Sequence, residues 1–323
     1  MTATPLSIPT LGIGDRVQDT FLVWDVETRT QSDGSPYAIL QLANSTGRAP
    51  TAPFWSADLP KIDGVIKGTV VNVVADVQEY RGARQFKVVS IRPLPKLAAD
   101  IARLLPSVGD VTPWWKTLDK WRAEMASGPW KRAVALFYDD ADFRLAYEQC
   151  PASTLSHHAM LGGLLKHTVE VAYVAQAIGR TCGANWDLLC AGVLLHDIGK
   201  LEAYRWDGLF EATTAGSLIG HLTLGALMLE RRLAELDPPL EAHQRLALQH
   251  ILLSHHGKLE FGSPVRPMTL EAEVLHLADT ASAATTNVAD ALKDPANFPE
   301  GGAVSRSLWT LDHRRVFRGP GRP

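Results

Sequence analysis

The residues best suited to chemistry are histidines and aspartates that recur in the C-terminal half of the chain. Of the eleven histidines, His167 repeats with Leu164 and Val171 on the apolar face expected of a helix. His196 and Asp197 end a strongly apolar segment. Burying a carboxylate is costly unless it is paired or binds a metal. These inward-facing groups therefore indicate a site rather than an ordinary core.

Further segments carry the same residue types. His221 opens a predicted helix, and His255 and His256 close another over 242–256. Asp279 lies on the apolar face of a predicted helix that follows. Imidazole together with carboxylate suits Mn, Fe, Ni, Co or Zn better than it suits a pure Mg or Ca site.

The candidate ligands outnumber what one ion needs. We therefore expect two divalent transition-metal ions, with Mn²⁺ as the first candidate and Fe, Ni, Co or Zn as alternatives. Asp197 is the natural bridge because it adjoins His196 in the same turn. The predicted ligands are His167, His196, Asp197, His221, His255, His256 and Asp279. His256 either completes the second ion's shell or contacts substrate.

The elements that position these groups are helical from about residue 164, where apolar residues repeat every three to four positions. The first part of the chain differs. Residues 14–92 carry short β-branched runs, for example 70–77 and 86–91, separated by turn residues. This pattern favours a small OB-like barrel, a fold that commonly binds oligonucleotides. A structural sandwich is the alternative.

A cluster of cations accompanies these predicted strands. We expect Arg81, Arg84 and Lys87 to follow the backbone of a bound nucleic-acid strand. The C-terminal tail is also rich in arginine, a composition that is often only solvated. Aromatic residues of the β region are candidates for base stacking, although such rings more often fill a core.

Composition sets the broad class. The 323 residues are 46% hydrophobic and 21% charged, with a net charge of −3, which is typical of globular domains and gives no global basic field. The three cysteines form no CxxC pair. The first residues lack the features of a signal peptide, and no apolar stretch is long enough to cross a membrane. We therefore expect a cytoplasmic protein with no membrane partner.

The run from His167 through His196-Asp197 to Asp279 resembles the ligand signature of the HD-domain metal-dependent phosphohydrolases, of which HDIGK is a common core form. The segments HHAMLGGLLKHTVEV, AGVLLHDIGK, LIGH and LSHHG look like those of YhaM-type 3′–5′ exoribonucleases. Those proteins pair an N-terminal OB-fold with a C-terminal HD domain. The resemblance implies a multidomain chain with an all-β OB-like barrel followed by an all-α HD domain.

The residue pattern together with the resemblance predicts domain bounds and a ligand set. We predict an OB-like nucleic-acid-binding domain over 1–93, a helical linker region over 94–150, an HD domain over 151–290 and a basic, loosely ordered tail over 291–323. One ion would be held by His167, His196, Asp197 and Asp279, and the other by Asp197, His221 and His255.

Several residues are predicted to act on the substrate. The two ions would lower the pKa of a water molecule and stabilise charge on the phosphoryl group. Lys200 would place a positive charge at the scissile phosphate, or is a solvated helix-end lysine. His157 and His158 would bind phosphate or protonate the leaving oxygen, or cap the helix. Gly162 and Gly163 suggest a close approach of backbone there.

Three functions compete. The first is a 3′–5′ exonuclease on single-stranded RNA, or DNA, that releases nucleoside monophosphates, its polarity coming from the family resemblance alone. The second is an HD-type hydrolase of nucleotides or cyclic dinucleotides with a regulatory β domain. The third is a nucleic-acid-binding protein without activity, which the full ligand set disfavours. The OB-like domain favours the first over the second, and homo-oligomerisation is left open.

Overall fold

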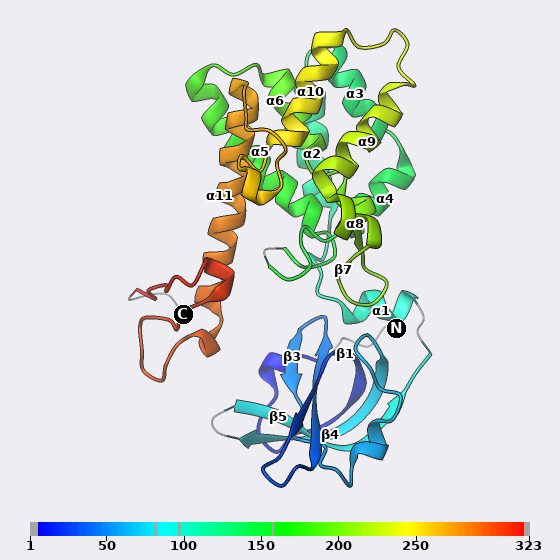
Figure 1. The fold of residues 1–323 in the computed structure, drawn as a ribbon, viewed down its shortest axis with the longest axis vertical. Helices are drawn as coiled ribbons and strands as arrows, with labels where there is room; N and C mark the ends of the chain where they lie inside the picture. Colours follow the sequence, from blue (N-terminus) through cyan, green and yellow to red (C-terminus); the bar gives the residue numbers. More distant parts are fainter. Residues whose placement is uncertain (1–5, 81–82, 96–97, 157, 320–323) are drawn as a thin grey trace. The chain divides into compact units, whose positions relative to one another are not determined.

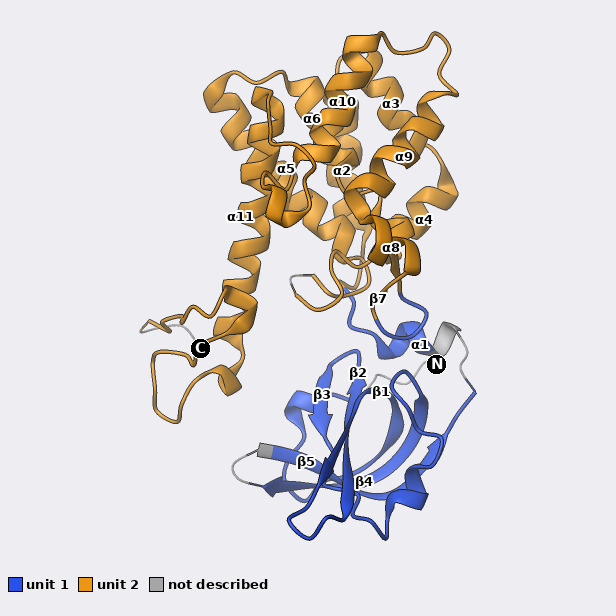
Figure 2. Ribbon diagram, in the orientation of Figure 1, with its two compact units in different colours: residues 1–107, 206–209 blue, residues 108–205, 210–323 orange. Residues whose placement is uncertain are grey.

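The computed structural model describes residues 6–80, 83–95, 98–156 and 158–319 (Figure 1). The chain forms two compact units, coloured separately in Figure 2. The first holds residues 1–107 and 206–209, and the second holds 108–205 and 210–323. No helix of the described residues is long and apolar enough to span a membrane.

The first unit is built on a five-stranded antiparallel sheet in the order β3-β2-β1-β4-β5. Its strands are β1 (Arg16–Thr30), β2 (Pro36–Asn44), β3 (Gly47–Pro50), β4 (Val70–Tyr80) and β5 (Ala83–Pro93). Just after β3, Thr51 forms a parallel bridge to Phe86 of β5, so the sheet closes on itself. This confirms the predicted OB-like barrel, a five-stranded, partly open fold.

Alternation of side chains explains the barrel's core. Along β4, Val71, Val73, Ala75 and Val77 are buried at every second position. They pack with buried residues of the other strands, among them Phe86. The unit also holds η1 (Ile8–Thr10), η2 (Leu59–Ile62) and α1 (Ala98–Leu104).

The second unit is helical, as expected. Its helices are α2 (Thr112–Glu124), α3 (Pro129–Tyr138), α4 (Ala141–Gln149), α5 (Gly163–Cys182), α6 (Trp186–Leu195), α7 (Lys200–Ala203), α8 (Thr214–Ile219), α9 (His221–Leu233), α10 (Ala242–Ser254) and α11 (Leu270–Lys293). A two-stranded ribbon, β6 (Tyr204–Arg205) and β7 (Glu211–Ala212), follows α7. Short turns η3 (Leu259–Phe261), η4 (Pro295–Asn297) and η5 (Trp309–Leu311) complete it.

Helix α6 lies at the centre of this unit and contacts α3, α5, α10 and α11 (Figure 1). Residues 188–195 are all buried, because this segment is apolar on every face and finds neighbours all round. Its first turn is fixed by Asn185, whose side chain accepts a hydrogen bond from the Leu188 backbone N–H. Helix α6 thereby holds the residues that follow it, His196 and Asp197, in the interior.

Residues 108–150 differ from the linker expected over 94–150, because they pack into the helical unit. The Tyr138 hydroxyl donates to the Leu194 carbonyl oxygen at 2.8 Å. The hydroxyl oxygens of Tyr147 and Thr168 lie 2.6 Å apart. Both tyrosine side chains are fully buried. Aromatic residues at helical spacing therefore make these helices part of the core that supports α5 and α6.

The C-terminal segment also has more structure than the loosely ordered tail that was expected. Isolated bridges pair Val304 with Phe317 and Leu308 with Arg314. Arg318 donates from Nη2 to the Leu292 carbonyl oxygen at 2.7 Å, which ties the segment back to α11. Backbone hydrogen bonds, which composition does not reveal, give this arginine-rich segment its order.

Candidate metal centre

The predicted ligands meet in the helical unit as two groups around Asp197. In the first group, His167 comes from α5 and His196 follows α6. The Nε2 atoms of His167 and His196 lie 3.6 and 3.2 Å from Asp197 Oδ2. Asp279 of α11 joins them, its Oδ1 lying 3.0 Å from His167 Nε2. Four polar side chains, from α5, α11 and the turn that follows α6, therefore converge on one point.

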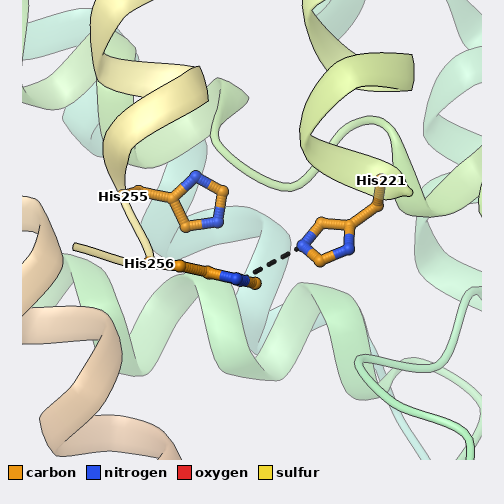
Figure 3. Close-up of side chains that lie close together, drawn as sticks. All are labelled: His221, His255 and His256. Carbon is orange, nitrogen blue, oxygen red and sulfur yellow. Dashed lines mark hydrogen bonds between the residues drawn. The ribbon is translucent and has the colours of Figure 1, made fainter. Parts of the chain in front are cut away.

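The second group faces the other oxygen of the same carboxylate. His221 begins α9, and His255 and His256 follow α10; Figure 3 shows their rings together. The Nε2 atoms of His221 and His255 lie 3.4 and 3.7 Å from Asp197 Oδ1. The Nε2 atoms of His221 and His256 lie 3.2 Å apart. Asp197 thus presents one oxygen to each group, which is the arrangement a bridging carboxylate needs.

Backbone anchors orient the histidine rings. The Nδ1 atoms of His196, His255 and His256 lie 2.7–2.8 Å from main-chain carbonyl oxygens. Because a carbonyl only accepts, we assign the ring hydrogen to Nδ1 in each case. The Nε2 lone pairs then point into the cluster, as in histidines that bind metals.

His167 has a polar support instead of a carbonyl. Its Nδ1 lies 3.2 Å from Ser282 Oγ, and this hydroxyl donates to Glu170 Oε2 at 3.0 Å. The Ser282 hydroxyl therefore accepts a hydrogen bond from His167 Nδ1–H and donates one to the Glu170 carboxylate. Glu170 Oε2 also lies 2.8 Å from His158 Nε2. A hydrogen-bonded network of Ser282, Glu170 and His158 thus supports the ring of His167.

Two buried polar atoms of the centre lack the partners that bound cations would supply. Among the described residues, Asp197 Oδ1 and His255 Nε2 are buried and make no hydrogen bond. Leaving a buried polar atom without a partner costs about 1–3 kcal/mol. Bound divalent ions would satisfy these atoms, and imidazole with carboxylate is a donor set for transition metals.

Neighbouring charges and burial set the pKa values of the candidate ligands so that Asp197 is ionised and His221 and His256 are neutral. Burial alone would raise the pKa of Asp197, but the positive charge of Lys200 and the interactions with His196 and His255 together outweigh it and hold that pKa well below its usual value. Lys200 Nζ lies 2.6 Å from Asp197 Oδ2, and the Lys200 side chain is buried. Burial lowers the pKa of His221 well below its usual value and that of His256 to about 4. Both imidazoles are therefore neutral near pH 7.

A pocket of about 490 Å³ opens over the centre. Lys200, His221, His256 and Asp279 line it, so both groups of candidate ligands reach one space. This volume is within the range of ligand pockets, roughly 300–1,000 Å³. Lys200 lines this pocket and is buried rather than solvated, and its predicted role at the scissile phosphate stays a prediction.

Four residues that precede the first ligand, His157, His158, Gly162 and Gly163, were also predicted to act at the site. His157 lies outside the described residues. His158 is 1% exposed and pairs with Glu170, a place suited to support rather than to contact with substrate. A Cβ atom on Gly163 would lie 2.0 Å from the His158 carbonyl oxygen. The close approach predicted at Gly163 is therefore to the protein's own backbone, whereas a Cβ atom on Gly162 would first meet the side chain of Val108, at 2.5 Å.

The predicted strand-binding cations lie in the first unit. Arg84 and Lys87 are exposed on β5, and Arg84 also donates from Nη1 to the Pro9 carbonyl oxygen at 2.9 Å. Arg81 lies outside the described residues. Sequence reasoning overlooked Glu170 and Ser282. Each follows a predicted ligand by three positions on the same helix, a spacing that places side chains on one face.

Comparisons with known proteins agree with this geometry. Residues 164–284 match the family model described as HD domain. The class is therefore that of the HD-domain metal-dependent phosphohydrolases. The 3′–5′ exoribonuclease YhaM of Bacillus subtilis is 30% identical over 311 residues, covering 95% of this chain and 96% of the relative. YhaM of Halalkalibacterium halodurans is 29% identical, covering 95% and 94%. The chain belongs to the YhaM family.

Proposed function

We propose that this protein is a metal-dependent phosphodiesterase that removes nucleoside monophosphates from the 3′ end of single-stranded RNA. The observation that carries the proposal is Asp197, whose oxygens each face one group of candidate ligands beneath a pocket that could take one nucleotide. Sequence similarity to 3′–5′ exoribonucleases over nearly the whole chain supports degradation from the 3′ end and an RNA substrate.

Two divalent ions would be held by this chain's own side chains. We assign His167, His196, Asp197 and Asp279 to one ion, and Asp197, His221, His255 and His256 to the other. Mn²⁺ is our first candidate, with Fe, Ni, Co or Zn as alternatives. When bound, such ions lower the pKa of water and stabilise charge on a phosphoryl group.

The protein's contribution is orientation and charge. Carbonyl anchors on Nδ1 fix the rings of His196, His255 and His256 before substrate arrives, so little reorganisation is needed. Lys200 lines the pocket and uses one of its three ammonium hydrogens on Asp197. A remaining hydrogen would bind an oxygen of the scissile phosphate.

The OB-like barrel would hold the RNA chain away from the scissile bond. Exposed Arg84 and Lys87 on β5 supply positive charge, and Trp55 and Tyr80 leave 46% and 57% of their surface exposed for stacking on bases. We retain Arg81 in this set on sequence grounds. Single-strand binding by such a surface tolerates many base sequences, which suits a degradative enzyme.

The second candidate is a hydrolase of nucleotides or cyclic dinucleotides with a regulatory β domain. It is favoured by one observation, that all proposed ligands and the pocket lie in the helical unit alone. One assay separates the two. The purified protein with Mn²⁺ is given 5′-labelled RNA and DNA oligomers, and the products are resolved at single-nucleotide steps. We expect a ladder shortening from the 3′ end, with RNA preferred. Intact oligomers alongside rapid hydrolysis of nucleotides would instead establish the second candidate.

A further inference from the structure

We propose that the pocket over the metal centre is a subsite for the 3′-terminal nucleotide, and that the turn at Asp312 selects ends with free 2′- and 3′-hydroxyl groups. This inference rests on the proposed function and adds an end specificity to it. It assigns a role to the C-terminal segment, whose Thr310, Leu311, Asp312 and Arg314 line the same pocket as the candidate ligands.

One wall of the pocket is a face of α11. Thr280, Ala283, Ala284 and Asn287 line it at spacings of three and four residues, continuing from Asp279 along the same helix. The two alanines have small side chains and leave room beside the ligand. Asn287 adds an amide that can both donate and accept hydrogen bonds. The pocket therefore extends from the metal centre along α11, and Asn287 places a polar group in its lining farther along the helix.

The turn that follows η5 also lines the pocket. Asp312 and His313 have φ values of 52° and 60°, the left-handed region that few residues other than glycine adopt. The turn is held by backbone hydrogen bonds from His313 N to the Leu308 carbonyl at 2.9 Å and from Arg314 N to the Leu311 carbonyl at 3.0 Å. Buried Leu311 fixes its base. Asp312 is thus presented in one backbone conformation.

Within the part of the chain that the structure describes, the charged side chains of this turn are not neutralised. Among the described residues, neither Asp312 nor Arg314 forms an ion pair. Arg314 donates from Nε to the Leu311 carbonyl oxygen at 3.1 Å, which leaves its Nη groups for a ligand. A carboxylate and a guanidinium facing one pocket match a ligand that has both hydroxyl and phosphate groups.

A 3′-terminal ribonucleotide has these groups in the required combination. Its adjacent 2′- and 3′-hydroxyls donate two hydrogen bonds, which the two oxygens of Asp312 can accept. Its phosphate oxygens can bind Arg314 and Lys200. Phe261, which is 58% exposed and lines the pocket, offers a face for stacking on the base. A 3′-phosphate would instead bring its negative charge to the carboxylate of Asp312.

The test compares three 5′-labelled RNA oligomers of one sequence, ending in a 3′-hydroxyl, a 3′-phosphate or a 2′-deoxynucleotide. The full-length Mn²⁺-loaded protein, Asp312→Asn and Arg314→Gln are compared by kcat/KM for release of the terminal nucleotide. Asparagine tolerates the left-handed conformation, so the turn is retained. The matched controls Glu300→Gln and Arg315→Gln remove the same charges from exposed positions outside the pocket lining.

We expect the wild type to prefer the 3′-hydroxyl end by at least about tenfold, because a hydrogen bond to a charged group is worth ~1.5–3 kcal/mol. Asp312→Asn should reduce that preference about tenfold, and Arg314→Gln should weaken binding of adenosine 5′-monophosphate, measured by calorimetry, to a similar degree. Both controls should match the wild type. Digestion from the 3′ end with an unchanged preference in Asp312→Asn would overturn this inference alone. Absence of RNA cleavage by the wild type would overturn the proposed function.

Discussion

Both groups of candidate ligands depend on Asp197, since each of its oxygens faces a different group. We predict that Asp197→Asn loses both ions and at least about a thousandfold in RNA hydrolysis, because metal ions supply several kcal/mol of transition-state stabilisation. His221→Ala should retain the ion bound at His167 and His196. Elemental analysis of the dialysed variants measures this. Two ions per chain in active Asp197→Asn would contradict the assignment.

Glu170 is a positioning residue, because it acts on the centre only through Ser282 and the ring of His167. Partners that orient a metal-binding histidine typically contribute 10–100-fold to metal affinity. We therefore predict that Glu170→Gln weakens binding of Mn²⁺ by about tenfold, measured by titration of the metal-free protein. Glu273→Gln, on the exposed surface of α11, is the control. Equal affinity in both variants would show that the network only supports the fold.

At the scale of elements, α2 and α4 are joined by a bidentate ion pair between Asp119 and Arg144. Arg144 donates from Nη1 and Nη2 to the two oxygens of Asp119, each at 2.9 Å. This hydrogen bonding from Arg144 lowers the pKa of Asp119. A carboxyl whose pKa is lower in the folded protein stabilises it above the unfolded pKa of ~3.9, and this stability is lost as pH falls through the folded value.

We therefore predict a coupling between Asp119→Asn and Arg144→Gln of about 0.5–1 kcal/mol at pH 7, modest because Asp119 is partly exposed to solvent. The coupling should fade below about pH 4. A double-mutant cycle on chemical unfolding at both pH values measures it. A coupling of the same size in acid would mean that packing, and not the charge of Asp119, joins these helices.

For the molecule as a whole, we propose that the barrel binds the RNA strand and that the helical unit hydrolyses it. Removing one cation that neutralises a phosphate of a single strand lowers the slope of log affinity against log salt by ~0.7. We predict such a change for Lys87→Ala, and about two units when Arg81, Arg84 and Lys87 are all replaced by alanine. Filter binding to long single-stranded RNA at several salt concentrations measures the slope.

The control for the barrel is Lys61→Ala, since Lys61 Nζ lies 2.7 Å from Asp58 and its charge is already paired. Its salt slope should equal that of the wild type. If the triple variant also keeps the wild-type slope, the barrel does not bind RNA through β5. A regulatory role for the barrel, as in the second candidate function, would then gain support.

The sequence by itself determined the two-part architecture and the identity of the candidate ligands. Both follow from local pattern: alternating β-branched residues predicted the barrel strands, and apolar periodicity placed His167 and Asp279 on the inner faces of helices. The His-Asp pair at the end of α6 stood out because a carboxylate in an apolar segment needs a compensating partner.

Only the tertiary structure decided which groups meet. His167, Ser282 and Glu170 are joined by hydrogen bonds across 112 and more positions of sequence, a contact that no local period encodes. The same holds for Asp312 and Arg314, which chain folding brings to the pocket of the metal centre, whereas the arginine-rich composition of the tail gave no sign of this contact. Local pattern fixes which face a side chain takes, whereas its partner depends on how distant elements pack.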